Sequence, residues 1–232
     1  MYESSLSYNQ EPAMEHALRV KTKMHAKQNL KISLFIIRGY CKLQLEFRPQ
    51  MADTKNYPTL VWLDLEMTGL DPDSERIIEI ATAVTSHDLT EIIEGPNLVI
   101  QQPMEYIDNM DEWNTNQHTK SGLVESLKVT NITIEEAQKQ TLEFLSLHTE
   151  AGRSPLCGNT ISHDRRFLRR YMPKLDAFFH YRNVDVSSIK ELIKRWNPEL
   201  LEGFRKSGGH RAMEDVLESI EELKFYRDKF FI

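Results

Sequence analysis

Two carboxylates interrupt an apolar stretch of the chain, and their spacing is the first sign of chemistry. Asp64 and Glu66 lie two positions apart within the run LVWLDLEM at 60–67. Side chains of a strand alternate between its faces, so these two would project from the same face. Neighbouring anions lose hydration and repel each other there, and a divalent cation with oxygen ligands would relieve this cost. The alternative is an edge strand whose polar face meets water.

Three further residues could join this pair. Asp164 falls at the expected start of a helix, where an aspartate could equally serve only the helix dipole. Gly208 and Gly209 precede His210, so we expect His210 on a loop before the helix that carries Asp215 one turn in. A histidine on such a loop and an aspartate fixed on a helix can converge on one point.

The elements that must position these residues follow from hydrophobic patterning. Apolar, β-branched runs predict strands at 59–67, 76–86 and 91–101, which are close enough in sequence to form an antiparallel meander. Helical patterns dominate after Pro103, with short strands predicted at 155–159 and 184–186. Strands followed by alternating helices and strands predict an α/β fold with a mixed five-stranded sheet flanked by helices.

Capping residues and breakers mark the ends of the predicted helices. The expected N-caps are Thr133, Ser162 and either Ser187 or Ser188. Glu136 would complete a capping box at the first of them. Pro173 ends the second helix, the third runs to Trp196, and the last helix spans 212–230.

Composition narrows the class of protein. The formal net charge of −6 excludes binding of nucleic acid through overall basicity, but leaves room for a local basic groove around a metal-neutralised acidic centre. Cys41 and Cys157 are too few for a disulfide framework or a zinc cluster. A reducing, intracellular setting fits best, and we predict a cytoplasmic protein.

The order of the acidic residues and the histidine resembles a known enzyme family. Asp64-x-Glu66, Asp164 and His210-x-x-x-x-Asp215 follow the pattern of the DEDDh 3′→5′ exonucleases, which implies a ribonuclease H-like fold. The surrounding segments are similar to the oligoribonuclease family, whose members cut very short RNA: WLDLEMTGLDP, RIIEIAT, GNTISHDRRFLRRYMPKL, FHYRNVDVSSIKEL and HRAMEDVLESIEELKFYR. The resemblance covers about residues 60 to 230.

The resemblance implies a two-metal hydrolysis of phosphodiester bonds. Asp64, Glu66 and Asp215 would hold one divalent cation, and Asp64 would touch a second that Asp164 supports. Mg²⁺ or Mn²⁺ suits such an all-oxygen site. One cation would activate a water and the other would stabilise the departing 3′ oxygen, while His210 would be the general base. The products would be 5′-mononucleotides.

The resemblance also implies a pocket that is closed around very short RNA, dinucleotides above all. Leu70 and Tyr181 would act as wedges against the bases, since apolar and aromatic surfaces stack on every base. Trp113 would frame the pocket. Spacing alone leaves open that Trp113 and Tyr181 are core aromatics.

Capture of the substrate's 5′ phosphate is the second implied feature. His118 and Arg182 would supply donors, together with hydroxyls of Thr160 and Ser187. Arg182 could otherwise form a surface ion pair. In the family, the residues at positions 181, 182 and 187 reach across from a second subunit, which would make a homodimer necessary for activity.

Two positions depart from the family's usual residues. Thr160 stands where Ser is common, which keeps the hydroxyl and adds a methyl group. Glu214 stands where Asp is common, beside Asp215. Neither belongs to the implied metal set.

Residues 1–50 differ from the remainder of the chain. They carry a net charge of +4, against −10 for the remainder. The apolar run at 32–37 is too short to span a bilayer and too deep for a secretory signal. Clustered basic residues permit an organelle-targeting peptide, but three glutamates disfavour it. We predict an N-terminal extension at 1–56, for which an upstream start before Met51 is one explanation, and an exonuclease domain at 57–232 without membrane attachment.

Two other functions compete with the oligoribonuclease hypothesis. An exonuclease of the same superfamily could trim longer RNA or DNA, for which a long basic groove would be expected. A non-catalytic nucleotide-binding protein would have a dead site, but all five catalytic-type residues are present in this chain.

Overall fold

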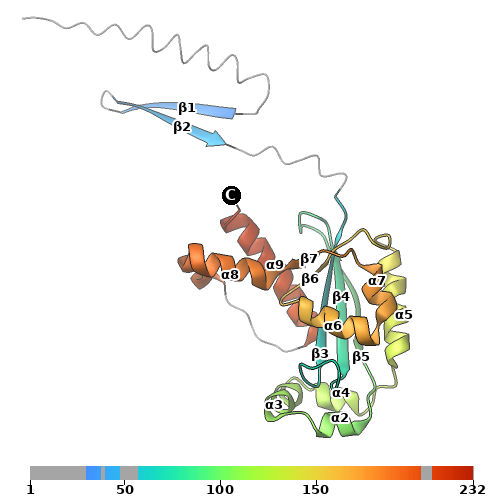
Figure 1. The fold of residues 1–232 in the computed structure, drawn as a ribbon. Helices are drawn as coiled ribbons and strands as arrows, with labels where there is room; N and C mark the ends of the chain where they lie inside the picture. Colours follow the sequence, from blue (N-terminus) through green and yellow to red (C-terminus); the bar gives the residue numbers. More distant parts are fainter. Residues whose placement is uncertain (1–29, 38–39, 48–56, 205–210, 232) are drawn as a thin grey trace, which may run out of the picture. The chain divides into compact units, whose positions relative to one another are not determined.

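The chain divides into two compact units, Met1–Asn56 and Tyr57–Ile232. The computed structural model describes residues 57–204 and 211–231 with their side chains, and the backbone of two strands in the first unit. These strands, β1 (Leu30–Ile37) and β2 (Tyr40–Phe47), pair antiparallel (Figure 1). The interpretation of 1–56 as an extension stays a prediction.

The second unit is organised around a five-stranded mixed sheet in the order β5-β4-β3-β6-β7 (Figure 1). Its strands are β3 (Leu60–Met67), β4 (Ile77–Thr85), β5 (Ile92–Val99), β6 (Leu156–Gly158) and β7 (Asn183–Asp185). β3, β4 and β5 form an antiparallel meander, whereas β6 runs parallel to β3 and β7 parallel to β6. The predicted α/β class, mixed sheet and meander are confirmed.

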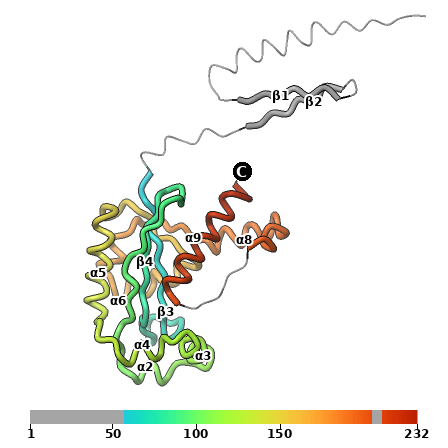
Figure 2. The backbone as a smooth tube through the Cα atoms, turned by 180° about the vertical axis from the view of Figure 1, so that it is seen from behind, coloured from blue at the N-terminus to red at the C-terminus, as the bar shows by residue number. Residues whose placement is uncertain are grey.

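Helices cover both faces of this sheet (Figures 1 and 2). One face packs against α5 (Ile134–Ser146), α6 (Ser162–Tyr171) and α7 (Pro173–Phe178), and the other against α8 (Val186–Trp196) and α9 (Ala212–Lys229). Beyond the C-terminal end of β3 lie α2 (Met104–Asp108), α3 (Glu112–Lys120) and α4 (Leu123–Leu127). A 3₁₀ helix, η2 (Pro198–Gly203), follows α8. Within the described residues, no helix is long and apolar enough to cross a membrane.

Alternate residues of β3 face two separate apolar layers. Leu63 and Leu65 lie in the layer that α5, α6 and α7 complete, while Trp62 lies in the layer of α8 and α9. Complete burial of side chains of this size stabilises the fold by about 1.5–3 kcal/mol each. Because the faces alternate, Asp64 and Glu66 share the face of Trp62, which is the face that α9 covers.

The capping residues were predicted with mixed success. Thr133 accepts a hydrogen bond from the backbone N–H of Glu136 at 3.2 Å, as expected for the start of α5. The Ser162 cap was wrong, because the N-cap position of α6 is Ile161 and no side chain caps it. The chain instead enters α6 from Thr160, whose φ is +52° and whose carbonyl accepts from the third residue on.

The cap predicted at Ser187 or Ser188 was also wrong. α8 begins earlier, and the Asp185 carboxylate accepts from the backbone N–H of Ser187 at 3.1 Å. Aspartate caps a helix as well as serine does, so three neighbouring candidates could not be ranked from the sequence.

Candidate active site

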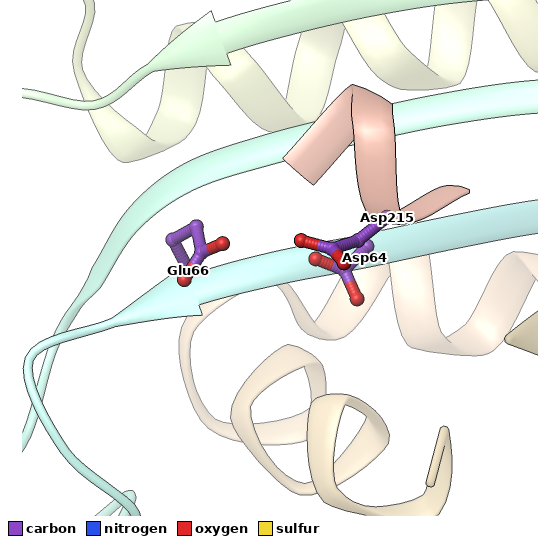
Figure 3. Close-up of side chains that lie close together, drawn as sticks. All are labelled: Asp64, Glu66 and Asp215. Atoms are coloured by element: carbon purple, nitrogen blue, oxygen red, sulfur yellow. The ribbon is translucent and has the colours of Figure 1, made fainter. Parts of the chain in front are cut away.

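Three carboxylates converge where α9 crosses β3 (Figure 3). Asp64 and Glu66 come from the strand, and Asp215 comes from the first turn of the helix, where its N–H donates to the Arg211 carbonyl at 3.0 Å. One oxygen from each of the three carboxylates lies within 4.8 Å of the others. Such a set of hard oxygen ligands suits Mg²⁺ or Mn²⁺.

The electrostatics of this cluster favour a bound cation. Burial raises the pKa of Asp64 well above its usual range, and the charges of Asp164 and Glu66 raise it further. Burial and the nearby Asp215 raise the pKa of Glu66 to about 8. Without a cation, Glu66 therefore retains a proton near neutral pH. A divalent cation between them would remove the repulsion that raises both pKa values.

Asp164 lies beside this cluster and is held there by the backbone of β3. Its Oδ1 accepts a hydrogen bond from the N–H of Leu65 at 3.0 Å. β6 pairs with β3 only as far as Trp62, so the sheet ladder on this side has ended before Leu65. The carboxylate from α6 satisfies a backbone donor that would otherwise be buried without an acceptor.

The charge state of Asp164 reflects two opposing effects. Burial raises the pKa of Asp164 to about 7. Hydrogen bonds from its own N–H and from that of Leu65 act in the opposite direction and lower the pKa. Asp185 adds a smaller increase. Asp164 is also the strongest charged influence on Asp64. The structure thus groups four acidic residues, three with converging oxygens and Asp164 next to Asp64.

Glu79 is a fifth acidic residue at this site and was not predicted from the sequence. It lies on β4 directly opposite Glu66 and is fully buried. Its carboxylate binds the Arg211 guanidinium, with Nη2 to Oε1 at 2.6 Å. The available signal was its place as the one charged residue in the otherwise uncharged strand IIEIATAVT.

His118 lies against the other side of Glu66. Its Nε2 is 3.0 Å from the carbonyl of Met67, and its Nδ1 is 3.9 Å from Glu66 Oε2. The His118 side chain is only 2% exposed. These contacts place His118 beside the carboxylate cluster of Asp64, Glu66 and Asp215. Donation of a hydrogen bond from His118 to a substrate phosphate stays a prediction.

Two of the predicted substrate aromatics are on the surface. Trp113 on α3 is 61% exposed and Tyr181 is 74% exposed, so the alternative that they are core aromatics is wrong. The Arg182 guanidinium lies 5.2 Å from the centroid of the Tyr181 ring, a cation–π distance. Leu70 is also exposed, at 69%, and its carbonyl lies 3.0 Å from Nε2 of His163.

The two predicted hydroxyls are adjacent. Thr160 Oγ1 and Ser187 Oγ lie 3.1 Å apart, and Ser187 Oγ donates to Asn159 Oδ1 at 3.0 Å. Asp185 Oδ1 accepts the backbone N–H of Thr160 at 2.9 Å, besides that of Ser187. The helix cap of α8 therefore also fixes this pair of hydroxyls.

The predicted base, His210, lies outside the described residues, which resume at Arg211. Its role therefore stays a prediction. Asp64, Glu66, Asp164 and Asp215 are brought together, and the hydroxyls of Thr160 and Ser187 form a separate pair.

Comparison with known proteins shows the family of this chain. A model of the exonuclease family RNase_T matches residues 61–223. The oligoribonuclease of Marinobacter nauticus is 56% identical over 176 residues, which are 76% of this chain and 98% of that protein. The oligoribonuclease of Shewanella amazonensis is 54% identical over 180 residues, 78% of this chain and 98% of that protein.

Solved structures show the same fold at low identity. Pop2p of S. pombe, in a form with Mg²⁺ and Mn²⁺ bound, aligns with a TM-score of 0.57 and 15% identity over 75% of this chain and 84% of that one. A zinc-bound complex of E. coli exonuclease I with single-stranded DNA aligns with a TM-score of 0.54 and 14% identity over 75% of this chain. This chain covers 41% of exonuclease I, less than half its length. The predicted ribonuclease H-like exonuclease fold is confirmed.

Proposed function

This chain belongs to the oligoribonuclease family and is a 3′→5′ exoribonuclease, and we propose that it degrades dinucleotides and other very short RNAs by two-metal hydrolysis. The observation that carries this proposal is the convergence of Asp64, Glu66 and Asp215 within 4.8 Å. A converging set of hard oxygen ligands is what a catalytic divalent cation requires.

The ligand roles follow from where the carboxylates lie. Asp64, Glu66 and Asp215 would hold one Mg²⁺ or Mn²⁺, and Asp64 would touch a second that Asp164 supports. The chemistry available from cations held there would be an activated water and neutralisation of the charge that develops on the departing 3′ oxygen. The hydrogen bond from Leu65 to Asp164 holds that carboxylate in place before substrate arrives.

Proton transfer is assigned to His210. An imidazole has an ordinary pKa near neutrality, so it can take the proton of the attacking water at physiological pH. Its neighbour Arg211 is held by Glu79 on β4, which fixes one end of the segment that carries the base.

The length of the RNA substrate would be selected by residues that lie away from the cations. The hydroxyls of Thr160 and Ser187 would donate to a terminal 5′ phosphate, assisted by Arg182 and His118. Exposed Leu70, Trp113 and Tyr181 offer surfaces for bases to stack on. We propose a cytoplasmic homodimer in which the partner's Tyr181 and the partner's Arg182 complete each pocket.

A length series tests this function. Purified protein with Mg²⁺ is incubated with 5′-phosphorylated RNAs of two, three, five and twenty nucleotides, and initial rates of mononucleotide release are compared. We expect the dinucleotide to react fastest and the rate to fall steeply with length. Equal or rising rates would replace this substrate assignment by trimming of longer RNA. Absence of cleavage with both Mg²⁺ and Mn²⁺ would leave a non-catalytic nucleotide-binding protein.

A further inference from the structure

We propose that Glu79 and Arg211 form a positioning pair that seats the first turn of α9 on the sheet and thereby sets the position of Asp215 relative to Asp64 and Glu66. The proposal rests on the proposed function, because it gives Asp215 its role as a ligand. Glu79 and Arg211 are assigned no contact with substrate or cation.

The sheet register places Glu79 at the edge of the carboxylate cluster. Glu79 on β4 is the direct partner of Glu66 on β3, and directly opposed residues of antiparallel strands project from the same face. Every residue of β4 is buried, and Glu79 has no exposed surface. A carboxylate in such a place is stable only when paired and hydrogen-bonded.

Among the described residues, hydrogen bonds to the Glu79 carboxylate come from the start of α9. Arg211 Nε lies 3.1 Å from both carboxylate oxygens, and its Nη2 lies 2.6 Å from Oε1. The backbone N–H of Ala212 donates to Oε2 at 3.2 Å. Both oxygens of Glu79 are therefore engaged by donors from the start of α9.

This arrangement replaces an ordinary helix cap. Arg211 occupies the N-cap position of α9, but its side chain makes no capping hydrogen bond. Glu79, 133 positions earlier than Ala212, supplies the acceptor for the first turn instead. A carboxylate there also complements the positive end of the helix dipole.

The position of Asp215 depends on the contact between Glu79 and Arg211 through one turn of backbone. Its N–H donates to the carbonyl of Arg211 at 3.0 Å, so movement of Arg211 is passed directly to Asp215. A displacement of about 1 Å in a catalytic group lowers turnover by about 100-fold. The pair therefore acts on the reaction through the position of Asp215.

The test compares Glu79→Gln, Arg211→Gln, the double variant and a control. Glutamine keeps the size of Glu79 and can still accept from Ala212, but it removes the ion pair. The control is Thr85→Val at the far end of β4, which removes the acceptor of a buried 3.0 Å hydrogen bond from Trp62 Nε1. It perturbs the same strand six residues away, or roughly 20 Å.

Four quantities are measured on each variant: the melting temperature, Mn²⁺ affinity by calorimetry, and the kcat and KM for a 5′-phosphorylated dinucleotide. We expect Glu79→Gln to lower kcat and Mn²⁺ affinity at least tenfold with KM nearly unchanged. The double variant should be no worse than the more damaged single variant, as residues that act as one unit show. Thr85→Val should lower the melting temperature while keeping kcat and Mn²⁺ affinity.

A folded Glu79→Gln variant with wild-type kcat and Mn²⁺ affinity would overturn the proposal. The same holds if Thr85→Val loses kcat in proportion to its melting temperature, since the effect would then be general destabilisation. Should Glu79→Gln not fold, Arg211→Lys is compared instead, because lysine keeps the charge without the bidentate geometry and should lose part of the Mn²⁺ affinity. Wild-type protein that cleaves no RNA would contradict the proposed function, whereas the Mn²⁺ titrations would still test the pair.

Discussion

The carboxylate of Asp164 accepts the backbone N–H of Leu65 at 3.0 Å, which ties the first turn of α6 to β3 between the two acidic residues of that strand. This bond joins β3 to the helix after β6, and Asp215 brings the C-terminal helix to the same strand. Asp164 therefore has two roles: it accepts a hydrogen bond from the backbone of β3, and its charge acts on the neighbouring Asp64.

Asp164→Asn separates these two roles. The amide oxygen can still accept from Leu65, so we expect a folded protein with an unchanged or higher melting temperature. Loss of the charge should lower kcat by about 100-fold, as for residues that support metal ligands. Activity and thermal unfolding measured on one preparation check this. An active Asp164→Asn protein would show that only the hydrogen bond matters, and Asp164→Ala should lose both stability and activity.

The metal-free protein should become less stable as pH rises. Glu66 and Asp164 have pKa values raised to about 8 and about 7 from ordinary values of 4.5 and 3.8. Between about pH 4 and pH 8 the folded protein therefore binds more protons than the unfolded chain, and its free energy of unfolding falls with increasing pH. A cation that binds only the folded state should reverse this loss.

This dependence is measured by the melting temperatures of the protein at pH 6 and pH 8, in a chelator and in Mg²⁺. We expect a lower melting temperature at pH 8 in chelator and recovery of that loss with Mg²⁺. Equal stability of the chelated protein at the two pH values would contradict the raised pKa values of the cluster.

Arg165 should control the segment that carries Tyr181 and Arg182. It is 8% exposed, and its Nη1 donates to the carbonyl of His180 at 3.0 Å and to the side chain of Asn183 at 2.5 Å. Arg165→Met removes both anchors while keeping the length of the side chain. We expect the KM for a 5′-phosphorylated dinucleotide to rise about tenfold, the equivalent of roughly 1.4 kcal/mol, with a smaller change in kcat.

Arg169→Met is the matched control for this prediction. Arg169 and Arg165 both bind Asp176, at 3.2 Å and 2.8 Å. Arg169 is exposed, and its replacement leaves the hydrogen bonds from Arg165 to His180 and Asn183 in place. Its KM should stay close to wild type. Equal KM values for the two variants would show that the segment is positioned by other contacts.

Local rules predicted part of this site. The i, i+2 spacing of Asp64 and Glu66 in an apolar run was sufficient to place them on one face of a strand, because the period of a strand is fixed. The start of α5 at Thr133 followed from capping chemistry alone. The cap of α8 did not, because Asp185, Ser187 and Ser188 have similar intrinsic capping ability. The start of α6 did not either, because no side chain caps that helix.

Long-range contacts were the part that the sequence could not supply. The approach of Asp215 to the strand pair was expected only from the family resemblance, since no local rule joins residues about 150 positions apart. Glu79 was missed because its partner Arg211 lies 132 positions away. The bond from Leu65 to Asp164 depends on where β6 stops pairing, which sequence patterns locate only to within a few residues.

The most direct test of the carboxylate site is Asp215→Asn, measured for both dinucleotide turnover and Mn²⁺ binding. We expect a folded protein that binds Mn²⁺ weakly and has no detectable turnover, because one of the three converging carboxylates is lost. A folded Asp215→Asn protein that hydrolyses dinucleotides at the wild-type rate would contradict the assignment of Asp64, Glu66 and Asp215 as the catalytic metal site.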